Sequence, residues 1–278
     1  TAVSCQTTAR VALRINPNIA ADTHPHISTG LVTHKFGVPI AEARAIARRA
    51  DERPGLAFVG LHVHIGSQMV GLEPIRQAAA AVVALARELR DDGVQVEHLD
   101  LGGGLGISYD EETVPLVQDY GAALVEAVRS SGLSLIVEPG RAVAGPAGAL
   151  LASVVDIKPR LDGTWFVVLD AGMSEFMRPT LYGAYHRITA LAESNTERVS
   201  CDVVGPICES SDVFGIGRML PLPAIGDVMA VLDVGAYGST MSSNYNRHPL
   251  PAEVMVDDGK WHVVRRRQTI DEQLACEE

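Results

Sequence analysis

The sequence predicts an α/β domain followed by an all-β domain. In the first half of the chain, apolar strand-like runs alternate with helical segments, which is typical of a parallel sheet. After about residue 146, strand-like runs follow one another at short intervals between Gly and Pro residues. Hydrophobic residues make up 47% of the 278 residues and charged residues 21%, which fits a globular protein with a sizeable core. We therefore expect one domain over 1–146 and a second over 147–278.

The first domain is predicted to contain strands separated by helices. The strands are expected at 10–17, 56–66, 96–104 and 133–141, and the helices at 40–50, 73–93 and 114–132. Both long helices are expected to begin near a proline and end at a glycine. This is about four βα units, half of a (β/α)₈ barrel, so we expect a partial barrel. The carboxyl ends of barrel strands carry the active site.

The second domain is predicted to be an antiparallel β sandwich or barrel. Strands are expected at 148–158, 164–172, 197–206, 227–238 and 252–264, with a final helix at 269–275. Short strands separated by turn residues, without a long helical period, favour this architecture.

Charge and cysteine content exclude several classes of function. The net charge of −11 argues against a nucleic-acid or membrane-surface partner. No apolar run reaches the roughly 18 residues of a membrane span, and the N-terminal "TAVSCQTTAR" lacks a signal-peptide pattern. Cysteines at 5, 201, 208 and 276 have no metal-site spacing. They indicate free thiols and a reducing cytoplasm.

Polar residues gather where the predicted strands of the first domain end. "HVHIGSQ" (62–68) places His62 and His64 on one face of a strand, which suits metal ligation, an aromatic ligand or two hydrogen-bonded core histidines. "GGGLG" (102–106) lets the backbone approach an anion, although a simple turn explains it equally well.

A carboxylate and a guanidinium follow the fourth strand. "VEPGR" (137–141) carries Glu138 and Arg141, which form either a structural ion pair or a site for a ligand with a basic nitrogen and an anionic group.

Three stretches of the second domain carry further candidates. "MRPTLYGAYHRI" (177–188) offers Arg178, Tyr182 and a second tyrosine, and "VGAYG" (234–238) offers Tyr237 between glycines. "VVGPICESSDVFG" (203–215) sets Cys208 beside Glu209 in a loop marked by Gly and Pro. A thiol beside a charge in a turn is a candidate for chemistry, although packing side chains and loop residues explain the single motifs as well.

Together the motifs resemble one family, the alanine-racemase-fold decarboxylases that use pyridoxal phosphate (PLP). Within it the chain is most similar to the members that act on diaminopimelate. The stretches that carry the resemblance are "HPHISTGLVTHKFGV", "GLHVHIGSQ", "LDLGGGLGISY", "VEPGRAVAGPAG", "DAGMSEFMRPTLYGAYH", "GPICESSD", "DVGAYGSTMSSNYNRHPLPAEV" and "RRRQTIDE". They extend from about residue 10 to the C-terminus.

The resemblance implies a set of residues that bind PLP. Gly103 and Ser67 are expected at the phosphate, His64 on the face of the pyridine ring, and Glu138 at the ring nitrogen. The remaining cofactor residues it implies are Pro139, Gly140, Arg141 and Tyr237. Protonation of the ring nitrogen by Glu138 makes the ring an electron sink.

The resemblance also implies a reaction, namely decarboxylation of meso-2,6-diaminopimelate to L-lysine and CO₂. Arg178, Tyr182 and Glu209 are expected to hold the unreactive end of the substrate, with Arg141 and Tyr237 nearby. That end carries a carboxylate and an ammonium group, so a cation and an anion suit it. Cys208 is expected to donate a proton to the carbon that loses CO₂. The family implies a homodimer whose cysteine loop reaches the partner's site.

One feature of the family is missing from the sequence. The family holds PLP through a lysine on its first barrel strand, and this chain has three lysines, at 35, 158 and 260. Lys35 matches a different lysine of the family, and the other two are expected to be solvated. We therefore expect an N-terminally truncated form that is inactive alone.

Within the same chemistry, a related enzyme that decarboxylates other amino acids remains open, and so do two rival interpretations. One is a metal-dependent barrel hydrolase that uses His62, His64 and Asp100. The other is a non-catalytic, lysine-less homologue that binds a partner.

Overall fold

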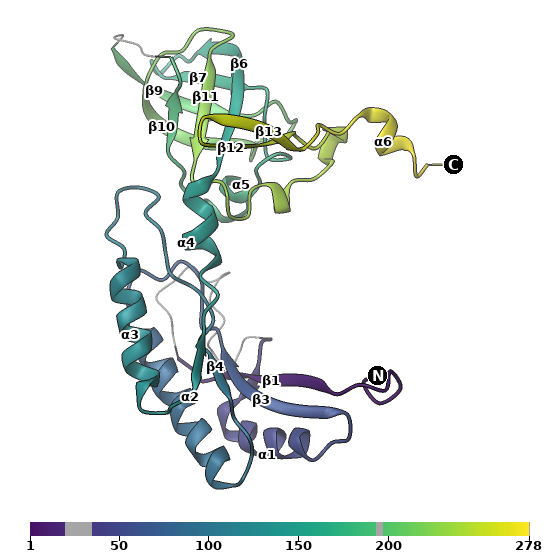
Figure 1. Cartoon of the computed structure of the whole chain (residues 1–278). Helices are drawn as coiled ribbons and strands as arrows, with labels where there is room; N and C mark the ends of the chain where they lie inside the picture. Colours follow the sequence, from purple (N-terminus) through teal and green to yellow (C-terminus); the bar gives the residue numbers. More distant parts are fainter. Residues whose placement is uncertain (20–34, 193–196, 278) are drawn as a thin grey trace. The chain divides into compact units, whose positions relative to one another are not determined.

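The computed structural model describes residues 1–19, 35–192 and 197–277. It divides into two compact units, Thr1–Val143 and Ala144–Glu278, each of which is described by itself (Figure 1). Residues 24–34 of the motif "HPHISTGLVTHKFGV" lie outside the described residues.

Unit 1 contains the predicted parallel sheet. Its strand order is β2-β1-β3-β4-β5, and every neighbouring pair is parallel. The strands are β1 (Ala9–Asn16), β2 (Val38–Pro39), β3 (Leu56–Val63), β4 (His98–Asp100) and β5 (Ser134–Ile136). The register places His62 of β3 between Arg14 of β1 and Asp100 of β4. Titratable side chains of three strands thus share one level of the sheet.

Three amphipathic helices cover one side of this sheet (Figure 1). They are α1 (Ile40–Asp51), α2 (Glu73–Asp91) and α3 (Val117–Arg129). The core between helices and sheet buries Leu61, Val63, Val82, Leu89, Leu99 and Leu124. Each fully buried aliphatic side chain contributes about 1.5–3 kcal/mol, so this layer holds the strand ends in place.

The end of unit 1 differs from the prediction. The fourth predicted strand, 133–141, is only three residues long and its side chains are largely exposed rather than buried. Gly140 and Arg141 belong instead to a short helix, α4 (Gly140–Ala144). Pro139 explains the change, because proline cannot donate a ladder hydrogen bond and its fixed φ suits the start of a helix. Pro115 likewise precedes α3 and its N-cap Leu116.

Unit 2 contains a six-stranded sheet and a separate hairpin. The sheet order is β10-β9-β7-β6-β11-β8, and β12 pairs with β13. The strands are β6 (Ala149–Pro159), β7 (Trp165–Leu169), β8 (Ile188–Ala190), β9 (Arg198–Val204), β10 (Val213–Pro221), β11 (Val228–Leu232), β12 (Glu253–Asp257) and β13 (Lys260–Arg265). Its core includes Val154, Val167, Leu169, Phe176, Met229 and Val231.

The prediction of a wholly antiparallel second domain was wrong at one pair of strands. β7 and β9 are parallel, whereas the other pairs in unit 2 are antiparallel. The reason lies in the connection between them. After β7 the chain first forms β8, which pairs with β11, and only then forms β9 beside β7. The two strands are therefore not joined by a tight hairpin and can run in the same direction. The edge strands β8 and β10 contact each other. Neither of these strands was predicted from the sequence, and neither was the short helix α5 (Arg178–Tyr182).

The final helix, α6 (Ile270–Leu274), begins at a capping box made by Thr269 and Glu272. Two short 3₁₀ turns, Ser239–Met241 and Tyr245–Arg247, precede the hairpin. Across the described ranges, no helix has the length and apolar character needed to span a bilayer.

Candidate functional site

The polar motifs of unit 1 meet at the carboxyl ends of β3, β4 and β5. His64 follows β3, the glycine loop follows β4, and Glu138 follows β5. The backbone N–H of Gly103 donates to Nδ1 of His64 at 3.1 Å, and the N–H of Glu138 donates to the carbonyl of Gly102 at 2.8 Å. The structure therefore joins three predicted stretches that lie far apart in the sequence.

The glycine loop is packed too closely for side chains. A Cβ atom added to Gly103 would lie 2.0 Å from the carbonyl oxygen of Glu138. Gly104 has a φ of +100°, a conformation that favours glycine. The loop therefore presents backbone atoms without side chains at Gly103, and a side chain there would displace the loop from Glu138.

Gln68, which was not predicted as a site residue, holds the end of this loop through its side chain. Its side-chain amide donates to the carbonyl of Ile107 at 2.6 Å and accepts from the N–H of Ile107 at 3.2 Å. Gln68 itself has a φ of +59°. Its place directly after Ser67 in "HIGSQ" was a usable signal, because such a paired bond needs an amide side chain.

His64 is neutral in this environment. Burial, followed by the charges of Arg14 and His62, lowers the pKa of His64 to about 4. Because a backbone N–H can only donate, Nδ1 of His64 must accept, and the ring proton therefore resides on Nε2. The site thus presents an uncharged imidazole.

Arg141 joins two further parts of unit 1. Its guanidinium donates to the hydroxyl of Tyr109 at 2.7 Å and to Oγ of Ser67 at 3.0 Å, and the side chain is buried. Ser67 and Arg141 were predicted together, and the structure brings them into contact. Tyr109 was missed, although it closes the quoted stretch "LDLGGGLGISY".

A cluster of possible metal ligands lies beside these residues. Ligand atoms of His62, Asp100 and Glu138 all lie within 4.8 Å of one another. Nε2 of His62 is 3.6 Å from Oε2 of Glu138. The metal interpretation named His62, His64 and Asp100, whereas the cluster contains Glu138 and not His64.

In unit 2, Arg178 lies at the start of α5 and is buried. Its Nη1 atom lies 2.6 Å from Nε2 of His186, and Nδ1 of His186 lies 2.8 Å from the carbonyl oxygen of Leu232 on β11. His186 is fully buried and was not predicted. Tyr182, at the other end of α5, is half-buried.

The loop that carries Cys208 and Glu209 is tied to the segment before α5. Oδ2 of Asp212 accepts from the N–H of Ile207 at 2.7 Å, and Oδ1 accepts from the N–H of Met173 at 2.6 Å. Burial raises the pKa of Asp212. Asp212 was quoted in the motif without a role, and it brings the two predicted substrate stretches side by side.

The chemical groups of this loop are exposed. Cys208 and Glu209 both lie at the surface of unit 2. The hydroxyl of Tyr245 donates to Oε1 of Glu209, and this bond raises the pKa of Tyr245. Tyr237 is 44% exposed and has a φ of +60°, so its backbone is held in a strained conformation.

Cysteines and lysines match the expectations from the sequence. All four cysteines are free. Lys158 on β6 and Lys260 on β13 are exposed, as predicted, and Lys35 is exposed as well.

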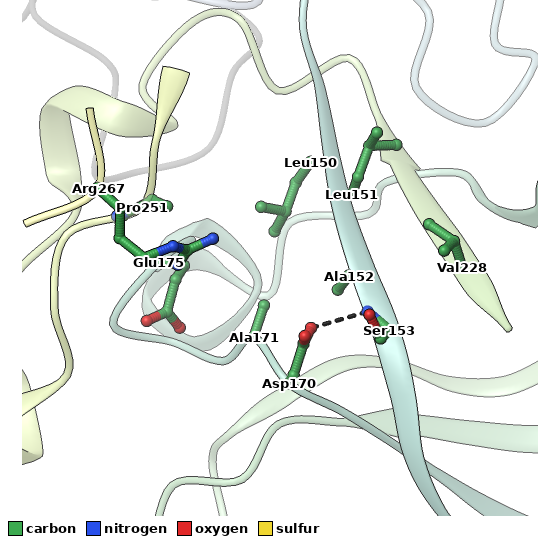
Figure 2. A pocket seen from close by; sticks show the side chains of 10 residues that line it. All are labelled: Leu150, Leu151, Ala152, Ser153, Asp170, Ala171, Glu175, Val228, Pro251 and Arg267. Carbon is green, nitrogen blue, oxygen red and sulfur yellow. Dashed lines mark hydrogen bonds between the residues drawn. The ribbon is translucent and has the colours of Figure 1, made fainter. Parts of the chain in front are cut away.

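A pocket of about 360 Å³ lies elsewhere in unit 2. Figure 2 shows its lining, with Asp170 bonded to the backbone of Ser153 on β6 and with Glu175 and Arg267 on the opposite side. The predicted site residues are not part of this lining, so we do not assign the pocket to the candidate site.

A family model and curated relatives match this sequence. The model described as "Pyridoxal-dependent decarboxylase, pyridoxal binding domain" matches residues 2–145. A diaminopimelate decarboxylase of Neisseria meningitidis is 43% identical over 97% of this chain and 66% of its own length. One of Helicobacter pylori is 42% identical over 97% of this chain and 67% of its own length. The chain therefore spans about two thirds of the length of these relatives.

Solved structures give the same result. Diaminopimelate decarboxylase from Helicobacter pylori complexed with L-lysine aligns with a TM-score of 0.94 at 41% identity, over 99% of this chain and 68% of that chain. The enzyme from M. jannaschii in complex with L-lysine aligns with a TM-score of 0.92 at 38% identity, over 100% of this chain and 65% of that chain.

Proposed function

This chain belongs to the pyridoxal-dependent decarboxylases, and from that premise we propose that the protein converts meso-2,6-diaminopimelate to L-lysine and CO₂. The observation that carries the proposal is the convergence of His64, Gly103 and Glu138 at three neighbouring strand ends. The relatives named diaminopimelate decarboxylase and the L-lysine in two related structures support this choice of substrate.

The residues of unit 1 fit pyridoxal phosphate. The cofactor has an anionic phosphate, an aromatic ring and a basic ring nitrogen. The cluster offers a close-packed glycine loop and the guanidinium of Arg141 with Ser67 for an anion. It also offers a neutral imidazole for the ring face and the carboxylate of Glu138 for the nitrogen.

We assign each of these groups a task in binding. Gly103, Ser67 and Arg141 would hold the phosphate, with Pro139 and Gly140 shaping the turn that presents Arg141. His64 would cover the ring face, and Glu138 would keep a proton on the ring nitrogen. Bound PLP supplies an electron sink for the electrons of the breaking carbon–carboxylate bond.

The groups of unit 2 suit the retained end of the substrate. That end carries a carboxylate and an ammonium group. Arg178 would bind the carboxylate, Glu209 the ammonium group, and Tyr182 and Tyr237 would add hydroxyl contacts. Cys208, beside Glu209, would donate a proton to the carbon that has lost CO₂.

The assembly is part of the proposal. We propose a homodimer in which Cys208 and Glu209 of one subunit serve the partner's site, and a cytoplasmic location, which free thiols favour. The parallel sheet of unit 1 would be about half of a (β/α)₈ barrel. We propose that turnover also requires the part of the relatives that this chain does not span, because the family resemblance assigns the PLP-binding role to none of Lys35, Lys158 and Lys260.

Reconstitution tests the proposed function. The chain is mixed with PLP, meso-2,6-diaminopimelate and a polypeptide that comprises the part of the H. pylori relative that this chain does not span. We expect release of CO₂ with formation of L-lysine, and neither product from the separate components. A mixture that binds PLP but forms no L-lysine would contradict the proposal and favour the non-catalytic interpretation.

Borohydride reduction locates the covalent attachment. After reduction in the presence of PLP, peptide mapping should find the label on the added polypeptide. A labelled Lys35 would show that this chain holds the cofactor without it.

The cluster of His62, Asp100 and Glu138 favours a second candidate, a metal-dependent hydrolase. The two functions compete for Glu138. Elemental analysis separates them, because the metal-dependent function requires a stoichiometric divalent ion in the purified chain and no binding of PLP.

A further inference from the structure

We propose that His186 is a positioning residue for Arg178 and thereby sets the preference for a substrate that carries a distal carboxylate. This inference rests on the proposed function, in which Arg178 binds that carboxylate. Its structural basis is a relay from Arg178 through the imidazole of His186 to the carbonyl of Leu232.

The two hydrogen bonds define the state of the imidazole. Arginine has donors only, so Nε2 of His186 accepts from Arg178. A carbonyl oxygen accepts only, so Nδ1 of His186 donates to Leu232. The ring is therefore a neutral imidazole with its proton on Nδ1.

The relay connects a short helix to a sheet. Arg178 begins the five-residue helix α5, whereas Leu232 ends the buried strand β11. The imidazole is fully buried, and its edge-to-face contact with Phe176 has a centroid distance of 4.7 Å and an angle of 85°. Packing thus fixes the ring orientation, and the ring fixes one N–H of the guanidinium.

A neighbouring arginine shows what a different partner would do. Arg187, directly after His186, pairs with the carboxylate of Asp233 at 2.8 Å. A carboxylate cancels the charge of its arginine, whereas a neutral imidazole holds the guanidinium and cancels none of its charge. A positioning group that preserves positive charge suits an arginine that recognises an anion.

Two amide variants separate the two bonds of the relay. In His186→Asn, the side-chain amide takes the position of Nδ1 and keeps the bond to Leu232, but the acceptor for Arg178 is lost. In His186→Gln, the amide reaches the position of Nε2 and keeps an acceptor for Arg178. Affinity is measured calorimetrically on the reconstituted mixture of this chain, PLP and the added polypeptide, using L-lysine, which has the distal carboxylate, and cadaverine, which lacks it.

We expect His186→Asn to weaken L-lysine binding about tenfold, the effect of losing one charge-assisted hydrogen bond, and His186→Gln to weaken it much less. Cadaverine affinity should not change. In an Arg178→Ala background, His186→Asn should have no further effect on L-lysine, because its role acts through the guanidinium. His262→Asn, at an exposed position on β13, is the matched control.

The outcomes separate the inference from the proposed function. If wild type binds L-lysine and both variants lose affinity equally, or lose affinity for cadaverine as well, His186 has a general structural role and the inference is wrong. Nitrogen NMR of wild type must also show the neutral Nδ1–H form at pH 7, and any other form contradicts the relay. A wild-type mixture that shows the Nδ1–H form but binds no L-lysine contradicts the proposed substrate and leaves the relay between His186 and Arg178 in place.

Discussion

The backbone N–H of Gly103 donates a hydrogen bond to Nδ1 of His64, and the two atoms are 3.1 Å apart. This bond joins the end of β3 to the loop after β4. The bond also requires an unprotonated Nδ1 on His64. The protonation state of His64 and the position of the glycine loop therefore depend on each other.

His64 makes the stability of the chain depend on pH. Its pKa is about 4 in the folded chain, against an ordinary value near 6.5. Between these values the unfolded chain binds more protons, so the free energy of unfolding should fall as the pH drops from 6.5 to 4. Because the ring is only partly buried, we expect the free energy of unfolding to fall by about 2 kcal/mol over this pH range. Urea unfolding at several pH values measures it.

Replacing the imidazole provides the control for this pH dependence. His64→Phe should remove most of the fall, whereas His262→Phe, at an exposed position, should retain it. An unchanged pH profile in His64→Phe would mean that another group is responsible.

Gly103→Ala should disrupt the contacts between the glycine loop, His64 and Glu138 that we propose bind PLP. Its Cβ would lie 2.0 Å from the carbonyl oxygen of Glu138, so the loop must move. We expect a loss of about 1–3 kcal/mol in the free energy of unfolding and at least tenfold weaker PLP binding, measured by fluorescence titration. Gly121→Ala on α3, where no atom lies within 4 Å of the added Cβ, should be neutral or stabilising. If Gly103→Ala and Gly121→Ala had equal effects on stability and PLP binding, the role proposed for the glycine loop in PLP binding would be wrong.

Asp212→Ala should separate the cysteine loop from the segment before α5. The substitution leaves the partly buried N–H of Met173 and the buried N–H of Ile207 without their carboxylate acceptor. We expect the free energy of unfolding, measured in urea, to fall by about 2–3 kcal/mol. Amide hydrogen exchange should become faster at Met173 and Ile207. Asp257→Ala, at an exposed position on β12, is the control. Unchanged exchange at Met173 would show that Asp212 does not hold the two segments together.

Cys208→Ala should lower kcat in the reconstituted enzyme and leave L-lysine affinity unchanged. Loss of a proton donor costs about 10²–10⁴ in rate, whereas the groups that bind the retained end remain. Cys276→Ala removes another exposed thiol and should behave as wild type. A Cys208→Ala variant with normal kcat would assign the proton transfer to a different group.

The sequence by itself determined the two kinds of architecture, because hydrophobic periodicity depends only on local chain geometry. It also indicated which stretches are candidates for chemistry, since glycine runs and paired charges are visible without a structure. It did not determine the parallel pairing of β7 with β9 or the short helix that takes Gly140 and Arg141. Strand pairing depends on long-range contacts, which have no local signature.

Only the tertiary structure decided the partners of the candidate residues. Gln68, Tyr109, His186 and Asp212 each bond to a group at least five positions away in sequence, and most of their bonds span more than thirty. A polar side chain can be buried because it forms a hydrogen bond, and the packing of the whole unit brings the partner atom close to it. For this reason, the sequence could propose Arg178 as a binding residue but could not reveal its contact with His186.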